Sequence, residues 1–302
     1  MQTAPTRFLP RDIGPWRVRC CVGLVSDTHI PERRAGLPTA LFDVLAGVDL
    51  ILHAGDVGML RVLDRLGALA PVVAVHGNDE TEDAQRELPS QQLIMAAGQR
   101  LLLCHSHLPD PGDEQAARGD DGWGPKLDRR AGLGQRAGAG VVVFGHTHIP
   151  MALTHRAVLL VNPGALASGS WTRRQRLQTV ALLFLLDRAD PVVVHVDLAV
   201  PERAFRPQVA WEAGYRAAHM AVTDPILSPA LAIRWERVAA RVRTLPPHQA
   251  RSLLLRVAYP CWNDGGAVIT PGDLLAAVRA DPLLPDAARE DLEAVLAASQ
   301  HR

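Results

Sequence analysis

The stretch Val141-Val142-Val143-Phe144-Gly145-His146-Thr147-His148 decides the fold of this chain. Its four apolar residues are typical of a buried strand, and two histidines follow where that strand ends. Four earlier apolar runs end in the same way, and the polar residues that follow them are Asp27 and His29, Asp56, Asn78, and His105. Open α/β sheets bind ligands at the carboxyl ends of their strands. The runs therefore predict one site that is assembled from several strand ends.

These side chains have the chemistry of a site for two divalent cations. Such a site needs a bridging carboxylate, neutral imidazoles and oxygen donors, with the ions about 3.5–4 Å apart. Asp56 suits the bridge, because a carboxylate shares its oxygens between two ions. The other ligands fall into two sets, Asp27 with His29 and Asn78 with His105, each completed by one of the last two histidines. Mn²⁺ is favoured, and Fe, Ni, Zn, Co or Mg²⁺ are alternatives that the donor types do not separate.

The order of these motifs resembles that of the calcineurin-like metallophosphoesterases. Asp-x-His, Gly-Asp, Gly-Asn, a single His after a strand and Gly-His-x-His occur in the family's order over roughly residues 18–200. Residues 25–29, 52–56 and 161–164 look like the small bacterial and archaeal phosphodiesterases of that family, whose fold a retromer subunit shares. The resemblance implies a sandwich of two sheets flanked by helices. It also implies two metals, one held by Asp27, His29, Asp56 and His148, and the other by Asp56, Asn78, His105 and His146.

The chain departs from the family's pattern at Asp79. Many members carry a histidine there, directly after the Gly-Asn, and the resemblance assigns it the protonation of the leaving group. General acid catalysis typically contributes about 10²–10⁴-fold, so we expect weak activity on monoesters with poor leaving groups. His107, two residues after His105, is a substitute candidate for the proton donor. The catalytic residues would then be Asp56, Asn78, His105 and His107.

Two classes of function compete. In the first, the chain is a dinuclear phosphodiesterase in which a metal-bridging hydroxide attacks the phosphorus of a small phosphate ester or nucleotide. A phosphomonoesterase and a dinucleoside polyphosphate hydrolase are alternatives within this class. In the second, the chain is a metal-binding scaffold of the same fold. All seven ligand positions keep metal-capable side chains, whereas scaffold relatives tend to lose theirs, so we favour the enzyme.

The composition sets few further limits. The 302 residues carry no net charge, which argues against a general attraction to nucleic acid. Residues 1–17 form a polar tail without the apolar stretch of a signal peptide, and no apolar run is long enough to cross a membrane. The four cysteines form no Cys-x-x-Cys pair, so we expect reduced thiols and a cytoplasmic protein. A homo-oligomer is compatible with these features.

Alternation of apolar runs with helical patterns predicts an α/β fold for residues 18–200. Strands are expected at 18–25, 48–53, 71–76 and 100–104, and helices at 37–46 and 59–69. Strands at 157–161, 179–186 and 192–198 lack long helices between them, which suggests an antiparallel or mixed end to a second sheet. Residues 201–302 change to helical periodicity and predict about four or five helices, forming a C-terminal all-α domain or cap.

Within the C-terminal helices, one helix is expected to carry Leu231, Trp235, Val238 and Val242 on a single face. Proline should separate the helices, Pro260 among them. The tryptophans assigned to the core are Trp211, Trp235 and Trp262.

Residues 106–124 are rich in Asp, Gly and Pro, which favours a solvated surface loop. The alternative is a lid over the metals that shapes substrate choice, with Trp123 stacking on a base or an aromatic leaving group. The candidate phosphate contacts in and after this segment are Arg118, Arg129, Arg130 and Lys126, the only lysine of the chain. The histidines expected to be structural are His53, His76, His155 and His195, and Asn162-Pro163-Gly164 is expected to be a structural turn.

Overall fold

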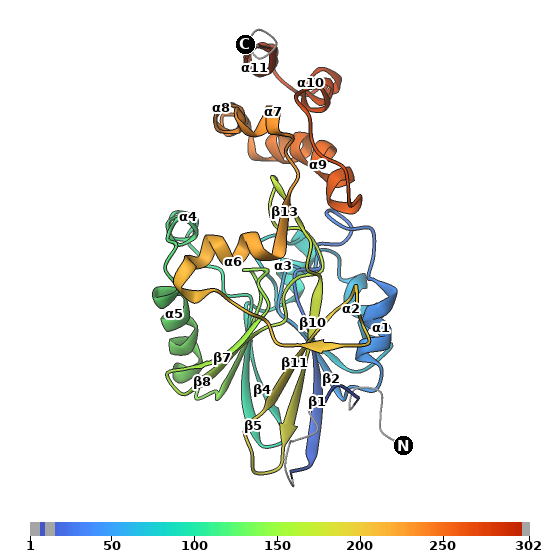
Figure 1. Ribbon diagram of the computed structural model, residues 1–302, viewed down its shortest axis with the longest axis vertical. Coiled ribbons are helices and arrows are strands. Elements are labelled where there is room, and N and C mark those ends of the chain that lie inside the picture. Colours follow the sequence, from blue (N-terminus) through green and yellow to red (C-terminus); the bar gives the residue numbers. More distant parts are fainter. Residues whose placement is uncertain (1–6, 10–15, 298–302) are drawn as a thin grey trace. The chain divides into compact units, whose positions relative to one another are not determined.

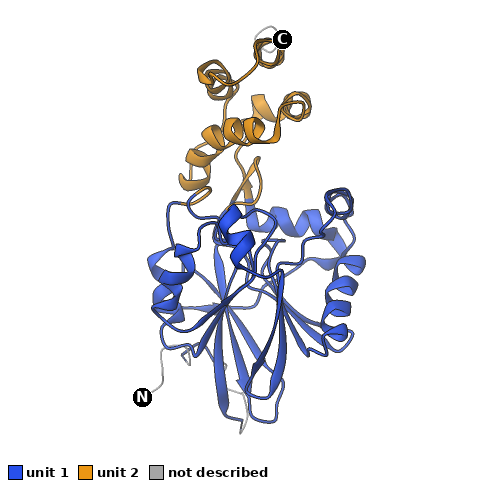
Figure 2. Ribbon diagram, turned by 180° about the vertical axis from the view of Figure 1, so that it is seen from behind, with its two compact units in different colours: residues 1–31, 35–167, 175–223 blue, residues 32–34, 168–174, 224–302 orange. Residues whose placement is uncertain are grey.

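The computed structural model describes residues 7–9 and 16–297 (Figure 1). The chain divides into two compact units, residues 1–31, 35–167 and 175–223 in the first and residues 32–34, 168–174 and 224–302 in the second (Figure 2). Residues 201–223 therefore cluster with the first unit, although the sequence grouped them with the C-terminal helices. The reason is that helix α6 (Gly214–Val222) buries Ala218 and Val222 against the core of that unit.

The first unit is built on two mixed sheets. One has six strands in the order β12 (Ala204–Phe205), β11 (Val192–Asp197), β10 (Thr179–Leu186), β1 (Val18–Val25), β2 (Leu50–His53) and β3 (Val72–Ala74). The other has five in the order β4 (Gln91–Ala96), β5 (Gln99–Cys104), β6 (Val141–Phe144), β8 (Val158–Asn162) and β7 (Met151–His155). This confirms the predicted two-sheet α/β fold, with helices at the C-terminus.

The placement of β10 and β11 corrects the sequence interpretation, which put them at the end of a second sheet. β10 pairs antiparallel with β1, in the middle of the six-stranded sheet, and β11 pairs with β10. Every residue of β10 is buried, as a central strand covered on both faces requires. Of the three strands predicted at 157–161, 179–186 and 192–198, only the first, β8, joins the five-stranded sheet.

The inner faces of the two sheets share a core that includes Leu24, Leu52, Leu103, Val143 and Leu183. Helices α1 (Thr39–Leu45) and α2 (Arg61–Gly67) pack with the six-stranded sheet, and α5 (Trp123–Arg136) and α6 pack with the five-stranded sheet (Figure 1). Helix α5 approaches its sheet closely at Gly134, where an added Cβ would lie 2.7 Å from Cγ2 of Val142. This packing gives the strand ends a rigid base.

Residues 106–124 contain a helix, α4 (Pro111–Gly119), and this corrects the interpretation as a loop. The Asp110 side chain accepts a hydrogen bond from the Asp113 N–H, and Pro111 occupies the first turn. Glu114 and Arg118 form an ion pair one turn apart. No residue of α4 is buried, so the helix has no apolar periodicity for the sequence to reveal.

Trp123 is covered by protein side chains, which overturns its expected role in stacking on a base or an aromatic leaving group. It is buried and packs edge-to-face on Trp211 and Tyr215, with ring centroids 4.9 and 5.3 Å apart. Trp211 itself is 38% exposed, so it lies at the edge of the core and not within it.

The second unit has helices α7 (Pro229–Ala232), α8 (Trp235–Val242), α9 (Pro247–Asn263), α10 (Pro271–Ala280) and α11 (Asp286–Ala297) around one apolar core. The predicted single helix is two, α7 and α8, although their inward side chains Leu231, Val238 and Val242 share that core. Helix α9 runs through Pro260 to its last turn, so this proline does not separate helices. No helix among the described residues is long and apolar enough to cross a membrane.

Candidate metal centre

The predicted ligands come from turns that directly follow strands of both sheets. Five of them have left-handed backbone conformations, with φ of 53° at Asp27, 44° at His29, 52° at Asp56, 70° at His146 and 59° at His148. Residues other than glycine rarely adopt this conformation, and it costs about 1–3 kcal/mol when the surrounding structure enforces it. Such strain is concentrated at sites where function fixes the direction of a side chain.

Glycines beside the ligands allow the turns to approach one another. A Cβ on Gly77 would lie 2.0 Å from Oδ1 of Asp56, and one on Gly145 would lie 2.8 Å from Oδ2 of Asp27. Gly55 has φ of 90°, and a Cβ there would meet the His105 ring at 2.6 Å. The Gly-Asp, Gly-Asn and Gly-His motifs are therefore needed for close packing as well as for their polar residue.

The structure brings together five of the predicted ligands in two overlapping groups. One group is Asp27, His29 and His148, and the other is Asp27, Asp56 and His105. Within each group one potential ligand atom per residue lies within 4.8 Å of the others, and all of these side chains are buried.

The distances fit a shared cation. Nε2 of His148 lies 3.1 Å from Oδ1 of Asp27, and Oδ2 of Asp56 lies 3.3 Å from Nε2 of His105. Ligand atoms at about 2.0–2.2 Å from one ion stand roughly 3.0–3.5 Å from each other. The site thus has ligand-to-ligand spacing that a bound divalent ion would have.

The tautomer of His105 is also set for metal binding. Its Nδ1 lies 2.7 Å from the carbonyl oxygen of Ala54, which only accepts, so Nδ1 carries the proton. In the neutral ring Nε2 then holds a lone pair, and this buried nitrogen makes no hydrogen bond with a described residue. A backbone carbonyl that orients a ligating histidine in this way is a common feature of metal sites.

The electrostatics of the ligands are those of two ionised carboxylates among imidazoles. Burial alone would raise the pKa of Asp27, but attraction to His148 and a hydrogen bond with it lower that pKa to about 2. Burial is likewise outweighed at Asp56, where His105 and His29 hold the pKa well below its usual range. The pKa of His105 rises to about 9, because Asp56 overcomes the effect of burial. Cations are attracted to such a site, and metal binding would displace the imidazole protons.

His146 belongs to neither of these groups of aspartates and histidines. Asn78 is exposed and lines a cavity of about 600 Å³ together with His76 and His107. Nε2 of His146 lies 2.6 Å from Oε1 of Glu114, in helix α4, while its ring stays 5.0 Å from that of His105. Glu114 was not among the predicted site residues, because the segment around it has the composition of a solvated loop.

Two acidic residues after Asn78 support the ligands. Asp79 has its carboxylate 3.5 Å from Nδ1 of His29, and its N–H donates to Oδ1 of Asp56 at 2.8 Å. The Glu80 carboxylate accepts from the N–H groups of Val57, Gly58 and Gly77 at 2.8–3.0 Å. It therefore ties the turn that carries Asp56 to the turn that carries Asn78.

The four histidines expected to be structural and the Asn162 turn have protein partners. His53 lies 3.1 Å from the Thr28 hydroxyl, and His195 lies 2.8 Å from the carbonyl oxygen of Asn162. His76 contacts the carbonyl of Gly77, and His155 pairs with Asp128. The Asn162 side chain donates to the Gly145 carbonyl at 2.9 Å, so this turn supports the Gly-His-Thr-His loop.

Comparison with known proteins identifies the class. Residues 21–187 match the calcineurin-like phosphoesterase superfamily domain. A protein named probable metallophosphoesterase, from Methanothermobacter thermautotrophicus, is 37% identical over 144 residues, which are 48% of this chain and 76% of that protein. Phosphodiesterase YfcE from Escherichia coli strain K12 is 32% identical over 114 residues, or 35% of this chain and 51% of that protein. Among solved structures, vacuolar protein sorting 29 from Cryptosporidium parvum is 19% identical, with a TM-score of 0.47 over 60% of this chain and 92% of that chain.

The chain belongs to the calcineurin-like phosphoesterase superfamily. This family is metal-dependent and hydrolyses phosphate esters. The resemblance seen in the sequence motifs is therefore confirmed.

Proposed function

We propose that this chain is a phosphodiesterase with a dinuclear metal site. The observation that carries the proposal is the position of the Asp56 carboxylate. Its Oδ2 lies 3.4 Å from Nε2 of His29 and 3.3 Å from Nε2 of His105, so one oxygen faces a histidine from each predicted ligand set. A carboxylate that bridges two ions has to lie between the ligands of one ion and those of the other.

The proposed ligands form two sets, one for each ion, and the two sets share Asp56. Two divalent ions, with Mn²⁺ favoured, would supply a nucleophile at neutral pH and stabilise the charge on the phosphoryl oxygens. The first set of ligands is Asp27, His29, Asp56 and His148, and the second is Asp56, Asn78, His105 and His146. His146 would have to exchange its hydrogen bond with Glu114 for the second ion.

Diesters with good leaving groups are the favoured substrates. Asp79 replaces the histidine that the resemblance assigns to protonating the leaving group. His107 lines the cavity beside Asn78, but burial and the neighbouring His105 lower its pKa to about 4. His107 is therefore neutral at pH 7, and it is better suited to a hydrogen bond with the substrate than to donating a proton to the leaving group. A leaving group that departs as a stable anion needs no such donor.

The test is hydrolysis of bis(p-nitrophenyl) phosphate against p-nitrophenyl phosphate, after chelation and re-addition of Mn²⁺, Ni²⁺, Zn²⁺ or Mg²⁺, with the bound metal counted by mass spectrometry. We expect metal-dependent cleavage of the diester in preference to the monoester, with two ions per chain. Loss of a residue that merely orients a ligand costs about 10–100-fold, so Asp56→Asn should cost about 100-fold or more.

Asp64→Asn is the matched control, because Asp64 is exposed on helix α2. It should keep both ions and full turnover. Unchanged turnover in Asp56→Asn would contradict the dinuclear assignment. Two bound ions without turnover of either substrate would favour a metal-binding scaffold.

A further inference from the structure

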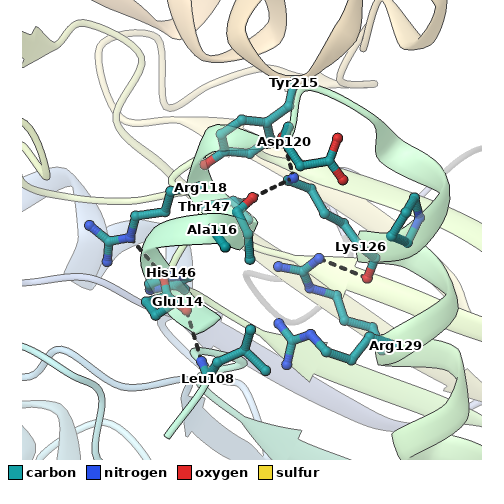
Figure 3. Close-up of a pocket in the computed structure, with 13 residues that line it drawn as sticks. Leu108, Glu114, Ala116, Arg118, Asp120, Lys126, Arg129, His146, Thr147 and Tyr215 are labelled. Carbon is teal, nitrogen blue, oxygen red and sulfur yellow. Dashed lines mark hydrogen bonds and ion pairs between the residues drawn. The ribbon is translucent and has the colours of Figure 1, made fainter. Parts of the chain in front are cut away.

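A second cavity lies beside the candidate metal centre, and the proposed reaction does not use it. It has a volume of about 340 Å³, within the usual range for a small-molecule site, and its walls come from α4, α5 and α6. Glu114 and Arg118 line both this cavity and the one beside Asn78. Figure 3 shows the Glu114–His146 pair on one side of the cavity and Lys126 and Arg129 on the other.

Three cations in this cavity, Lys126, Arg129 and Arg130, are bonded only to neutral oxygens. Lys126 Nζ donates to the carbonyls of Ala117 and Asp120, the former at 2.8 Å. Arg129 donates to the Ser106 carbonyl, and Nε of Arg130 donates to the Ser106 hydroxyl at 3.1 Å. None of the three forms an ion pair with a carboxylate of the described residues.

No carboxylate bonds these three cations directly, so the positive charge in the cavity is only partly compensated by the acidic residues around it. Arg130 is 2% exposed, and burial together with the neighbouring Arg129 lowers its pKa to about 10. Burial also lowers the pKa of Lys126 and of Arg129. Two carboxylates line the cavity. Glu114 is already paired with His146 and Arg118, and Asp120 accepts a hydrogen bond from the Gly122 N–H and attracts Lys126 without forming an ion pair with it. A buried guanidinium such as that of Arg130 is costly without a counter-charge, and an anion in the cavity would offset that cost.

The rest of the lining adds a polar contact and an apolar wall. The Tyr215 ring lies 5.1 Å from Lys126 Nζ, and its hydroxyl makes no hydrogen bond with a described residue. Leu108, Ala116 and Pro125 supply the apolar surface. A cavity whose wall combines these donors with carbon suits an anionic group that is attached to an organic body, more than a free ion.

Lys126 has a structural role too, because it bonds the last carbonyls of α4. That role uses two of its three N–H groups and leaves one for a ligand. It does not explain why two arginines with neutral partners share the same cavity. Lys126 is also the only lysine among the 32 lysines and arginines of the chain, which makes it selectively addressable by amine chemistry.

We propose that this cavity binds a second phosphate group of the substrate. His146 lines the cavity and is also a predicted metal ligand, so a phosphate here is close to the reacting phosphodiester. The inference rests on the proposed function and narrows its substrate to a phosphodiester with one arm that carries a further phosphate.

The first test compares two diesters that differ only in this group, thymidine 5′-(p-nitrophenyl phosphate) with and without a 3′-phosphate. Charge-assisted hydrogen bonds to a bound phosphate correspond to about tenfold or more in affinity. We therefore expect kcat/KM to be about tenfold or more higher for the 3′-phosphorylated diester. Lys126→Met and Arg129→Met should each bring this ratio toward one. Arg136→Met is the control, because Arg136 is exposed on the same helix α5, and its ratio should equal that of the wild type.

The second test measures binding without turnover, in the full chain after removal of metals by a chelator. Pyridoxal 5′-phosphate condenses with the Lys126 amine to an imine with loss of water, and borohydride reduces the imine to a stable secondary amine. Peptide mapping should find the label at Lys126 beyond any at the N-terminal amine. Inorganic phosphate at about ten times its Kd should slow labelling roughly tenfold, whereas acetate at equal ionic strength should not. Lys126→Arg should remove the label and retain part of the preference for the phosphorylated diester.

The two tests separate this inference from the proposed function. Turnover of both diesters at equal kcat/KM, with no protection of Lys126 by phosphate, would overturn the second-phosphate site and leave the phosphodiesterase standing. Protection by phosphate without turnover of either diester would refute the phosphodiesterase and keep an anion site. Equal protection by acetate would show a cavity that does not select phosphate, and this too would overturn the inference.

Discussion

Gly77→Ala should disable the candidate metal centre although it replaces none of the predicted ligands. A Cβ at this position would lie 2.0 Å from Oδ1 of Asp56 and 2.6 Å from its nitrogen, whereas ordinary contacts begin at 3.4 Å. The carboxylate or its turn must therefore move by more than 1 Å. Functional groups have to be held within about 0.5 Å, and a misplacement of about 1 Å costs about 100-fold in rate. We expect kcat/KM on the diester to fall by about 100-fold or more.

The same steric overlap also predicts changes in the number of bound ions and in the free energy of unfolding. Displacing Asp56 removes the shared ligand, so fewer than two ions should remain after gel filtration in metal-free buffer. Overpacking at a buried site typically costs about 1–3 kcal/mol, which urea unfolding of the metal-free protein would measure. Gly67→Ala is the matched control, because nothing lies within 4 Å of a Cβ at this helical glycine. It should keep full activity and gain about 0.5–1 kcal/mol.

The outcome that would refute this reasoning is specific. Gly77→Ala with two bound ions and kcat/KM within threefold of the wild type would show that Asp56 does not need its present position. A loss of activity that appeared equally in Gly67→Ala would point to general destabilisation and not to the site.

Further predictions concern Glu80, Glu114 and Trp262. Burial raises the pKa of Glu80 from 4.5 to about 7, so in chelator the stability from this group is complete below pH 4.5 and lost as pH rises through 7. The free energy of unfolding of wild type minus that of Glu80→Gln should therefore fall over this range, and a rise would contradict the assignment. Glu114→Ala removes a hydrogen bond to His146 that is worth roughly 1.5–3 kcal/mol, and His146 becomes available to the second ion. The affinity for that ion, measured by calorimetry, should therefore rise about tenfold or more. The same substitution in a His146→Ala background should not raise it. Trp262→Phe removes a donor 3.0 Å from the Ser170 carbonyl and should cost about 1–3 kcal/mol in thermal unfolding; an unchanged midpoint would contradict this.

The strand-end ligands were predictable because their signals are local. An apolar run followed by Asp, Asn or His marks both the strand and the residue that follows it, as at Asp56 after β2 and His105 after β5. Helix α4 gave no such signal, since a helix without a buried face has no apolar period. Only its capping residues, Asp110 and Pro111, indicate a helix, and these also occur in ordinary turns. Glu114 was missed for this reason.

Long-range pairing was the other limit. The run at β10 indicates burial on both faces, but its partner β1 is more than 150 residues away, and no local pattern encodes that pairing. In the C-terminal helices, the apolar period of α7 and α8 is continuous, and only the backbone shows a break between them. Pro260 has no N–H to bond the carbonyl four residues before it, yet helix α9 continues through it to Asn263, so proline alone did not locate the end of this helix.

The backbone of the ligands shows why residue type alone describes this site incompletely. Local preference predicts ordinary extended or helical conformations for Asp and His, yet Asp27 and Asp56 after strands of one sheet and His148 after a strand of the other are held at positive φ. This arrangement points side chains from two sheets toward one centre, and the packed sandwich beneath provides the stability that offsets its cost. The glycines next to Asp56 and His105 serve the same geometry by leaving no Cβ between the turns. The geometry of the site therefore depends on the ligands and the glycines together. A substitution of either should reduce metal binding more than it reduces the stability of the fold.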